Sequence, residues 1–144
     1  MKLAIASDHA GFALKEEIKK AFPEHDFKDF GTHNEESMDY PDTGYPAAKA
    51  VATGECEMGI LICGSGIGMS ITANKVPGIR AALCYLTDIA RLSRMHNNAN
   101  ILVLAGRFTA PAYAISITKE WLSTPFEGGR HQNRLNKIDQ GETK

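Results

Sequence analysis

The sequence predicts a three-layer α/β/α domain built on a five-stranded, mainly parallel β-sheet. Short apolar runs alternate with longer amphipathic segments along the chain, and the apolar runs are nearly continuous rather than interrupted by polar residues. Strands that are apolar on both faces are typical of parallel sheets, which helices cover on both sides. A chain of 144 residues fits a single domain, which can bury roughly two thirds of the surface that the unfolded chain exposes.

Five segments are expected to form the strands. The clearest are residues 58–64 (MGILICG) and 100–106 (NILVLAG), in which Ile, Leu and Val predominate. Residues 25–31 (HDFKDFG) alternate between polar and apolar, as a half-exposed strand does. Residues 3–7 (LAIAS) and 79–85 (IRAALCY) complete the set.

The segments between these strands are expected to form helices, which allows neighbouring strands to run parallel. In residues 11–22, apolar side chains recur near the helical period, and Pro23 ends the helix. Residues 40–55 are expected to begin as a proline-containing loop and to form a helix that closes at Gly54, and residues 65–75 are expected to form a helix after a glycine-rich entry. Two further helices are expected at residues 87–98, capped by Thr87 and Asp88, and at residues 109–123, where Thr109 is the cap before Pro111.

The C-terminal segment, residues 126–144, is polar and carries Arg130 and Arg134 four positions apart, which places both on one face of a helix. It is poor in apolar anchors, which is more readily explained if the segment reaches over a ligand or a neighbouring subunit. We therefore expect residues 1–125 to form the main body and residues 126–144 to be a helix and tail of the same domain that reach the partner subunit.

Composition excludes several classes of protein. The net charge is −1, so the total charge gives no sign of the basic surface that nucleic acid or an anionic membrane would need, and any anion site must come from a local arrangement of a few residues. The N-terminal apolar run is too short for a signal peptide, and no stretch has the length of a transmembrane helix. The three cysteines are odd in number and none is spaced as C-x-x-C, which argues against a disulfide framework or a zinc site. A cytoplasmic protein is expected.

Functional side chains are expected just beyond the carboxyl ends of the strands, where ligands bind in parallel sheets. Asp8 and His9 follow the first strand, a glycine-rich loop follows the strand at 58–64, and Arg107 follows the last strand. Asp8 fits a cap for the helix at 11–22 and also a contact to a hydroxyl-rich substrate, and both can hold for one residue.

The glycine-rich loop is expected to bind an anion. Glycines let backbone N–H groups point into a concavity, and the following helix adds the positive end of its dipole. The loop lacks the G-K-[ST] of a P-loop and departs from the spacing of the dinucleotide pattern, so it predicts neither. The alternative is a tight structural turn. Its residues are Gly64, Ser65, Gly66, Ile67 and Gly68.

Cys63 immediately precedes this loop. The N-terminus of the following helix is expected to lower the pKa of its thiol, which makes it usable as a base or a nucleophile. The alternative is that Cys63 only fills a buried position, as we expect of Cys56 and Cys84.

A histidine and three arginines complete the candidates. His96 lies at the end of the predicted helix 87–98, where the dipole favours a cation, so it is either a structural residue or a proton donor near neutral pH. Arg107, Arg130 and Arg134 fit bidentate binding of a phosphate, or else an ordinary solvated surface.

The chain resembles the ribose-5-phosphate isomerase B family, which includes the galactose-6-phosphate isomerase subunits. The resemblance rests on seven blocks in the same order and covers about residues 3 to 138. The blocks are SDHAG, DYPD, CGSGIGMSITANK, GIRAALC, LSRMHNNANIL, AGR and EGGRHQNR.

The resemblance implies a Rossmann-like fold, a homodimer or tetramer with active sites shared between subunits, and no metal or organic cofactor. It places the catalytic base on Cys63 and the ring-opening acid–base group on His96. Some members use a glutamate base where this chain has Met69, which cannot take a proton, and several carry threonine at Ser65. The implied substrate-binding residues are Asp8, His9, Tyr40, Gly64, Ser65, Gly66, Ile67, Gly68, Asn97, Arg107, Arg130, His131 and Arg134.

The implied activity is the interconversion of ribose 5-phosphate and ribulose 5-phosphate through an enediolate, a reaction of the non-oxidative pentose phosphate pathway. A second hypothesis is the isomerisation of a hexose 6-phosphate, either allose or galactose 6-phosphate. A third is a module that binds a nucleotide or a sugar phosphate without turnover, which leaves Cys63 and His96 unused.

Overall fold

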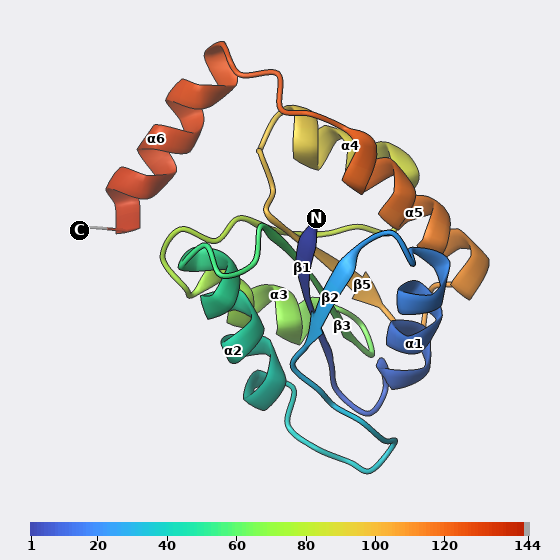
Figure 1. The fold of residues 1–144 in the computed structure, drawn as a ribbon. Helices are drawn as coiled ribbons and strands as arrows, with labels where there is room; N and C mark the ends of the chain where they lie inside the picture. Colours follow the sequence, from blue (N-terminus) through green and yellow to red (C-terminus); the bar gives the residue numbers. More distant parts are fainter. Residues whose placement is uncertain (143–144) are drawn as a thin grey trace.

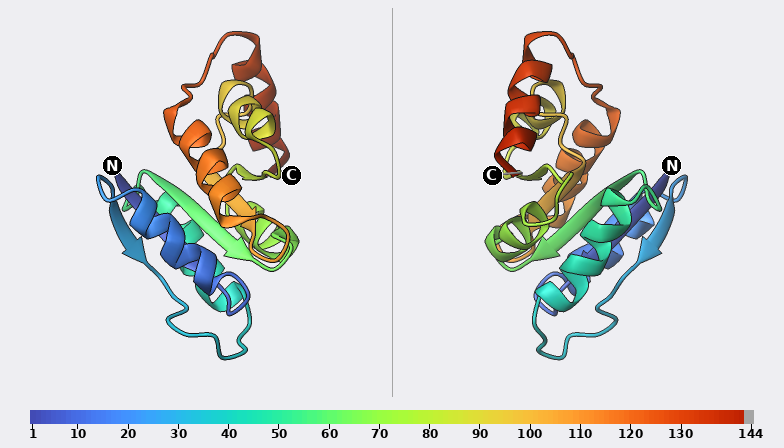
Figure 2. Two further views of the ribbon diagram at one scale, coloured as in Figure 1. Left: turned by 90° about the vertical axis from the view of Figure 1, so that its right-hand side faces the viewer. Right: turned by 90° about the vertical axis from the view of Figure 1, so that its left-hand side faces the viewer.

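A computed structural model describes residues 1–142 and confirms the predicted fold class. Five strands form one sheet in the order β2-β1-β3-β5-β4, and every neighbouring pair is parallel. Helices cover both faces of this sheet (Figures 1 and 2). The last two residues of the expected C-terminal segment, 143 and 144, lie outside the described residues. The strands are β1 (Lys2–Ser7), β2 (Asp26–Asp29), β3 (Met58–Cys63), β4 (Ala81–Leu83) and β5 (Ile101–Ala105).

The helices divide between the two faces of the sheet. One core lies under α1, α4 and α5, and the other lies under α2 and α3. The last helix, α6, stands away from the sheet at one end of the molecule (Figure 1). None of the helices within residues 1–142 has the length and apolar character needed to cross a membrane. The helices are α1 (Phe12–Ala21), α2 (Pro41–Ala52), α3 (Ile67–Asn74), α4 (Thr87–Met95), α5 (Pro111–Ser123) and α6 (Arg130–Glu142).

The two central strands, β3 and β5, are buried on both faces, as their continuous apolar sequences predict. Successive side chains of a strand point to opposite faces. Ile60 and Ile62 therefore enter the core under α1, α4 and α5, whereas Leu61 and Cys63 enter the core under α2 and α3. This alternation turns the Cys63 side chain toward the helix that follows it.

The predicted side-chain caps of α4 and α5 are wrong. The residues at the N-cap positions are Leu86 and Ala110, and neither makes a side-chain capping hydrogen bond. At the start of α4, the N–H of Thr87 donates to the hydroxyl of Tyr113 at 3.3 Å, so a neighbouring helix supplies the acceptor. The first-turn proline of α5 is confirmed.

A buried ion pair fixes the chain where β1 and β2 end. Lys15 is fully buried in α1, and its Nζ donates to the two carboxylate oxygens of Asp29 at 2.8 and 2.9 Å. Asp29 also accepts the N–H of Gly31 at 2.8 Å, and the Gly31 carbonyl accepts the N–H of Ser7 at 2.7 Å. The ion pair therefore holds the carboxyl end of β1, where the candidate site begins.

Loss of the buried lysine should destabilise the domain strongly. Burial raises the pKa of the Asp29 carboxyl, but hydrogen bonds from Lys15 and Lys19 outweigh it and leave the pKa below its ordinary value. Lys15→Ala breaks the buried pair, which typically costs about 3 to 5 kcal/mol. Lys19→Ala removes a partner of the same carboxylate that is 31% exposed, and should cost less than about 1 kcal/mol. Urea denaturation of both variants measures the difference in the free energy of unfolding. Equal losses of stability would contradict the conclusion that Lys15 is the more important partner of Asp29.

Candidate functional site

The loop between β3 and α3 is held tightly against the neighbouring strand. Cys63 is the last residue of β3 and pairs with Ala105 of β5. The N–H of Gly106 donates to the Cys63 carbonyl at 2.8 Å, and the N–H of Arg107 donates to the Gly64 carbonyl at 3.0 Å. These bonds place the ends of both central strands, with the side chains that follow them, at one edge of the sheet.

Gly66 gives this loop a shape that other residues would resist. Its φ of 80° lies in the left-handed region, and an added Cβ would lie 2.4 Å from Cδ1 of Leu83. The turn brings the first N–H groups of α3 back over the end of β3. The backbone N–H groups of Gly66, Gly68 and Met69 consequently favour the charged form of Cys63 and act to lower the pKa of its thiol.

Burial raises the pKa of the Cys63 thiol, and the prediction of a lowered pKa is wrong for the isolated chain. The side chain is only 4% exposed, so the thiolate loses most of its hydration. The three N–H groups oppose this effect, whereas the negative charge of Asp8 adds to it. The site thus contains the donors that a thiolate needs, but in one chain they do not outweigh the cost of burying the charge.

The remaining residues at this edge enclose an open cavity of about 430 Å³. Asp8 is buried, and its Oδ1 accepts the N–H of Gly11 at 3.0 Å, one residue before α1 begins. The ring of Tyr40 lies against Gly68, where an added Cβ would come within 2.4 Å of the ring. The cavity is lined by Asp8, Tyr40, Cys63, Gly64, Ser65, Ile67, Gly68, Ile71 and Arg107.

Two predicted residues at this edge are not among those that line the cavity. His9 accepts the N–H of Met38 at Nδ1 over 3.2 Å, so in this structure it fastens the loop before α2. Gly66 is buried beneath the turn. Ile71 lines the cavity but was missed, although its position four residues after Ile67 on one face of a helix could have indicated it.

Met69 is fully buried and packs against α2 rather than lining the cavity. Its sulfur lies 2.6 Å from where a Cβ would stand on Gly44, and its exposed fraction is 0%. Because methionine has no carboxylate, the proton-accepting side chain next to the amides of α3 is that of Cys63.

The other predicted residues gather at a second place. His96 follows the last residue of α4, and its ring stacks on that of His131 with centroids 4.3 Å apart and planes 13° apart. Asn97 follows His96 and is exposed. Arg130 and Arg134 occupy the first turns of α6 and are exposed, so both arginines are available to a ligand.

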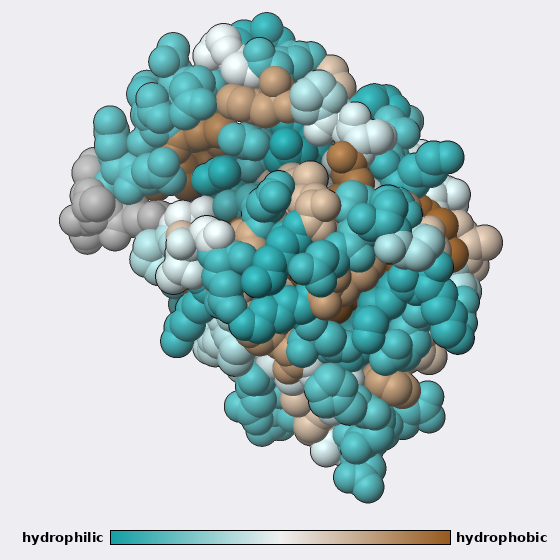
Figure 3. Space-filling model, viewed as in Figure 1, coloured by the Kyte–Doolittle hydropathy of each residue, from teal (hydrophilic) through white to brown (hydrophobic). Residues whose placement is uncertain are grey.

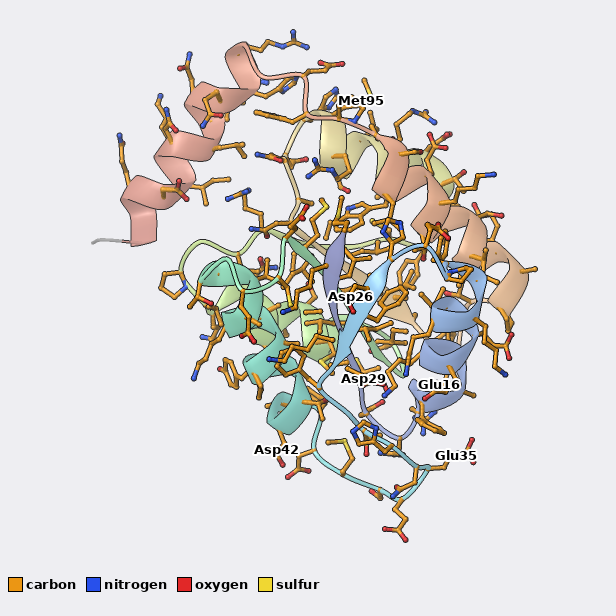
Figure 4. All side chains as sticks on the ribbon, in the orientation of Figure 1. Glu16, Asp26, Asp29, Glu35, Asp42 and Met95 are labelled. Atoms are coloured by element: carbon orange, nitrogen blue, oxygen red, sulfur yellow. The ribbon has the colours of Figure 1, made fainter. Side chains whose placement is uncertain are left out.

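These two groups lie at opposite ends of the sheet. Gly59 pairs with Ile101 at the start of β5, whereas Cys63 pairs with Ala105 at its end, about 13 Å further along the strand. His96 precedes β5 and Cys63 ends β3, so the parallel sheet separates them. In Figure 4, Met95 and Asp42, which lie close in sequence to His96 and Tyr40, stand at opposite ends of the molecule.

Three side chains in the second group could approach a metal ion. His96, His131 and Glu127 place one potential ligand atom each within 4.8 Å of the others. Imidazole nitrogens bind a metal in the plane of the ring. Because the two rings are stacked and nearly parallel, their lone pairs do not converge on one point in this arrangement.

An exposed apolar surface adjoins the cavity at the first edge. The exposed fractions of Phe108, Ile71, Leu86 and Ile67 are 76%, 56%, 54% and 53%. Phe108 and Ile67 line a groove with Tyr85, whose hydroxyl donates to the Ser65 carbonyl at 2.9 Å. Apolar side chains exposed together in this way are typical of a surface that another protein covers.

Comparison with known proteins connects this geometry to a family. The sequence matches the family model described as Ribose/Galactose Isomerase over residues 3–138. YwlF of Bacillus subtilis is 50% identical over 147 residues, covering 100% of this chain and 99% of its own, and its name specifies no particular sugar. Ribose-5-phosphate isomerase B of Escherichia coli is 45% identical, over 95% of this chain and 93% of its own.

Solved structures agree with the sequence comparison. Ribose-5-phosphate isomerase B of Clostridium thermocellum superposes with a TM-score of 0.98 at 51% identity, covering 99% of this chain and 98% of its own. The enzyme of the same name from Mycoplasma genitalium, solved with bound ribulose-5-phosphate, gives a TM-score of 0.95 at 39% identity and covers 99% and 97%.

The negative charge of Asp8 should restrain the reactivity of the thiol. Because this charge raises the pKa of Cys63, Asp8→Asn should increase the thiolate fraction at a fixed pH near neutrality. Alkylation of Cys63 by iodoacetamide, located by peptide mass spectrometry, should become severalfold faster. The matched control is Asp42→Asn, which removes an exposed carboxylate in the first turn of α2 and should leave the rate unchanged. An unchanged or slower rate in Asp8→Asn would refute the electrostatic coupling.

Proposed function

The chain belongs to the ribose/galactose isomerase family of sugar phosphate isomerases, and we propose that it interconverts ribose 5-phosphate and ribulose 5-phosphate. The observation that carries this proposal is a thiol that lines an open cavity together with the glycine-rich loop, whose backbone N–H groups favour its charged form. The names of the relatives from Escherichia coli and Clostridium thermocellum support the five-carbon substrate, as does the ribulose-5-phosphate in the Mycoplasma genitalium structure.

The proposed reaction moves one proton between two carbons. The thiolate of Cys63 takes the proton from C2 of the open-chain aldose, and the C2–H electrons form the C1–C2 double bond of an enediolate. The electrons of the C1=O double bond move to O1. The thiol then delivers a proton to C1, either the one it removed or one that it has exchanged with water, while a second proton moves from O2 to O1. A positioned base typically contributes about 100- to 10,000-fold to the rate. In this proposal the N–H groups of the glycine loop stabilise the negative oxygens, and each such donor is typically worth about 100- to 1000-fold.

The substrate's other groups match the other predicted residues. Asp8, Tyr40 and Ser65 line the cavity and offer hydrogen bonds to sugar hydroxyls, and Arg107 lines it too. Ribose 5-phosphate enters mainly as a ring, and we assign the opening of that ring to His96. Arg130 and Arg134 are assigned to the phosphate, which they can hold by bidentate hydrogen bonds, with Asn97 and His131 beside them.

One chain cannot assemble this site, because its two halves lie at opposite ends of the sheet. A second copy related by two-fold symmetry would bring its His96 end over the Cys63 end of the first and would create two identical sites. The exposed apolar surface around Phe108 and Ile67 is then the surface that the second copy covers. We therefore propose a homodimer with shared sites, in which residues 126–142 reach the partner.

The second copy also accounts for the thiol. In the isolated chain, burial raises the pKa of Cys63. Two arginines from the partner would bring positive charge to the cavity, which would favour the thiolate.

Loss of the thiol should remove most of the activity. Cys63→Ala should lower kcat by at least about 100-fold and should also abolish deuterium uptake from heavy water into ribulose 5-phosphate, because both need proton transfer at carbon. Cys56→Ala, which also removes a buried thiol, should retain activity. Near wild-type turnover by Cys63→Ala would show that another group is the base.

A panel of ribose, allose and galactose phosphates tests the identity of the substrate. A higher kcat/KM for a hexose phosphate would overturn the five-carbon assignment.

Mixing two inactive variants should restore activity if sites are shared. Cys63→Ala and His96→Ala should each inactivate both active sites of a homodimer. After unfolding and refolding together in equal amounts, about half of the dimers should be mixed and should carry one intact site each. The expected activity is about a quarter of the wild-type value. No recovery, with mixed dimers verified by mass spectrometry, would place both residues in the same chain's site.

A further inference from the structure

The geometry points to Glu127 as the residue that positions the His96–His131 pair for ring opening, an inference that rests on the function proposed above. Oε2 of Glu127 lies 3.3 Å from Nε2 of His131, and the His131 ring stacks on the ring of His96. Glu127 thus acts on His96 through a second ring, at a distance from the sugar.

His131 needs such a partner because it is buried. Only 4% of the residue is exposed, and within the described residues its Nε2 makes no hydrogen bond of good geometry. A buried polar atom without a partner typically costs about 1 to 3 kcal/mol. The Glu127 carboxylate is close enough to become that partner with a small side-chain rotation, and a proton held on Nε2 then fixes the orientation of the ring.

Glu127 is itself anchored to the helix that carries His96. Its backbone N–H donates to the Met95 carbonyl at 3.1 Å, one residue before His96. The preceding segment is held by Arg94, whose Nε donates to the Thr124 carbonyl at 3.1 Å. The carboxylate therefore starts from a fixed backbone position and is 42% exposed at the side chain.

The same contact ties α6 to the site. Gly128 and Gly129 follow Glu127 with φ values of 71° and 60°, so the chain turns sharply before α6 begins. Within residues 130–141, only His131 and Leu135 are buried. Figure 3 shows hydrophobic surface along the side of α6 that faces the body, yet the helix stands apart from the sheet in the ribbon of Figure 1. The Glu127–His131 contact is thus one of few that fix the arginine-bearing helix relative to His96.

The inference separates two steps of the reaction. Ribulose 5-phosphate is linear, because its O5 is phosphorylated and cannot close a furanose ring, so deuterium exchange at its C1 requires proton transfer but no ring opening. Conversion of ribose 5-phosphate requires both. A defect in positioning His96 should therefore slow conversion while sparing exchange.

The test compares Glu127→Ala and Glu127→Gln with the matched control Glu120→Ala, which removes an acid of α5 that pairs with Arg91 at 3.5 Å. Glu127→Ala should lower kcat for ribose 5-phosphate about 10- to 100-fold, by analogy with the carboxylates that orient metal-ligating histidines. It should lower exchange into ribulose 5-phosphate much less. Glu127→Gln, which keeps an acceptor for the His131 N–H, should recover part of the loss, and Glu120→Ala should change neither rate.

The possible results distinguish failure of the positioning role of Glu127 from failure of the proposed function. Equal losses of conversion and exchange in Glu127→Ala, or no loss of either, would overturn the positioning role. A wild-type protein that converts no ribose 5-phosphate would overturn the proposed function instead. Imidazole proton resonances of His96 and His131 test the stack without any assay of activity: they should shift in Glu127→Ala, and unchanged resonances would also overturn the inference.

Discussion

The parallel pairing of β3 with β5 determines how every other part of the site can be used. Cys63 ends β3, whereas His96 precedes β5, so the direction of the two strands places them at opposite ends of the sheet. No adjustment of side chains spans that separation within one chain. The proposal of a second copy follows from this one constraint, and that copy would also give the exposed apolar surface and the outlying α6 a partner.

The thiol illustrates a balance between two physical effects. Burial at the end of a core strand fixes the direction of the sulfur but disfavours its charge, and the N–H groups of α3 favour the charge. In the isolated chain, burial is the larger effect. In the proposed dimer, arginines of the second copy would bring positive charge beside this thiol, which would couple the proposed chemistry to assembly.

The sequence patterns identify the fold and most of the site for a simple reason. Uninterrupted apolar strands separated by helices permit few arrangements other than a parallel sheet, and loops that follow such strands meet at one edge. Asp8, Cys63, the glycine loop and Arg107 are therefore together as predicted. The seven sequence blocks added Tyr40, which reaches the cavity from the start of α2 and has no signal of its own in the hydrophobic pattern.

Features that depend on burial or on contacts between distant segments could not be predicted from the sequence pattern. The pKa of Cys63 depends on how completely the thiol is buried, which a sequence pattern does not quantify. The acceptor for the start of α4 is Tyr113, a residue of another helix, so local capping rules did not find it. Glu127 lies in a segment in which the sequence singled out only the arginines and a histidine. Its role became visible only from the stacking of the His131 ring on the His96 ring.

The most direct test of the shared site is a crystal structure with ribulose 5-phosphate bound. In the proposed dimer, Cys63 from one copy and His96, Arg130 and Arg134 from the other contact the same sugar phosphate. A sugar phosphate bound entirely by one chain would contradict the shared site.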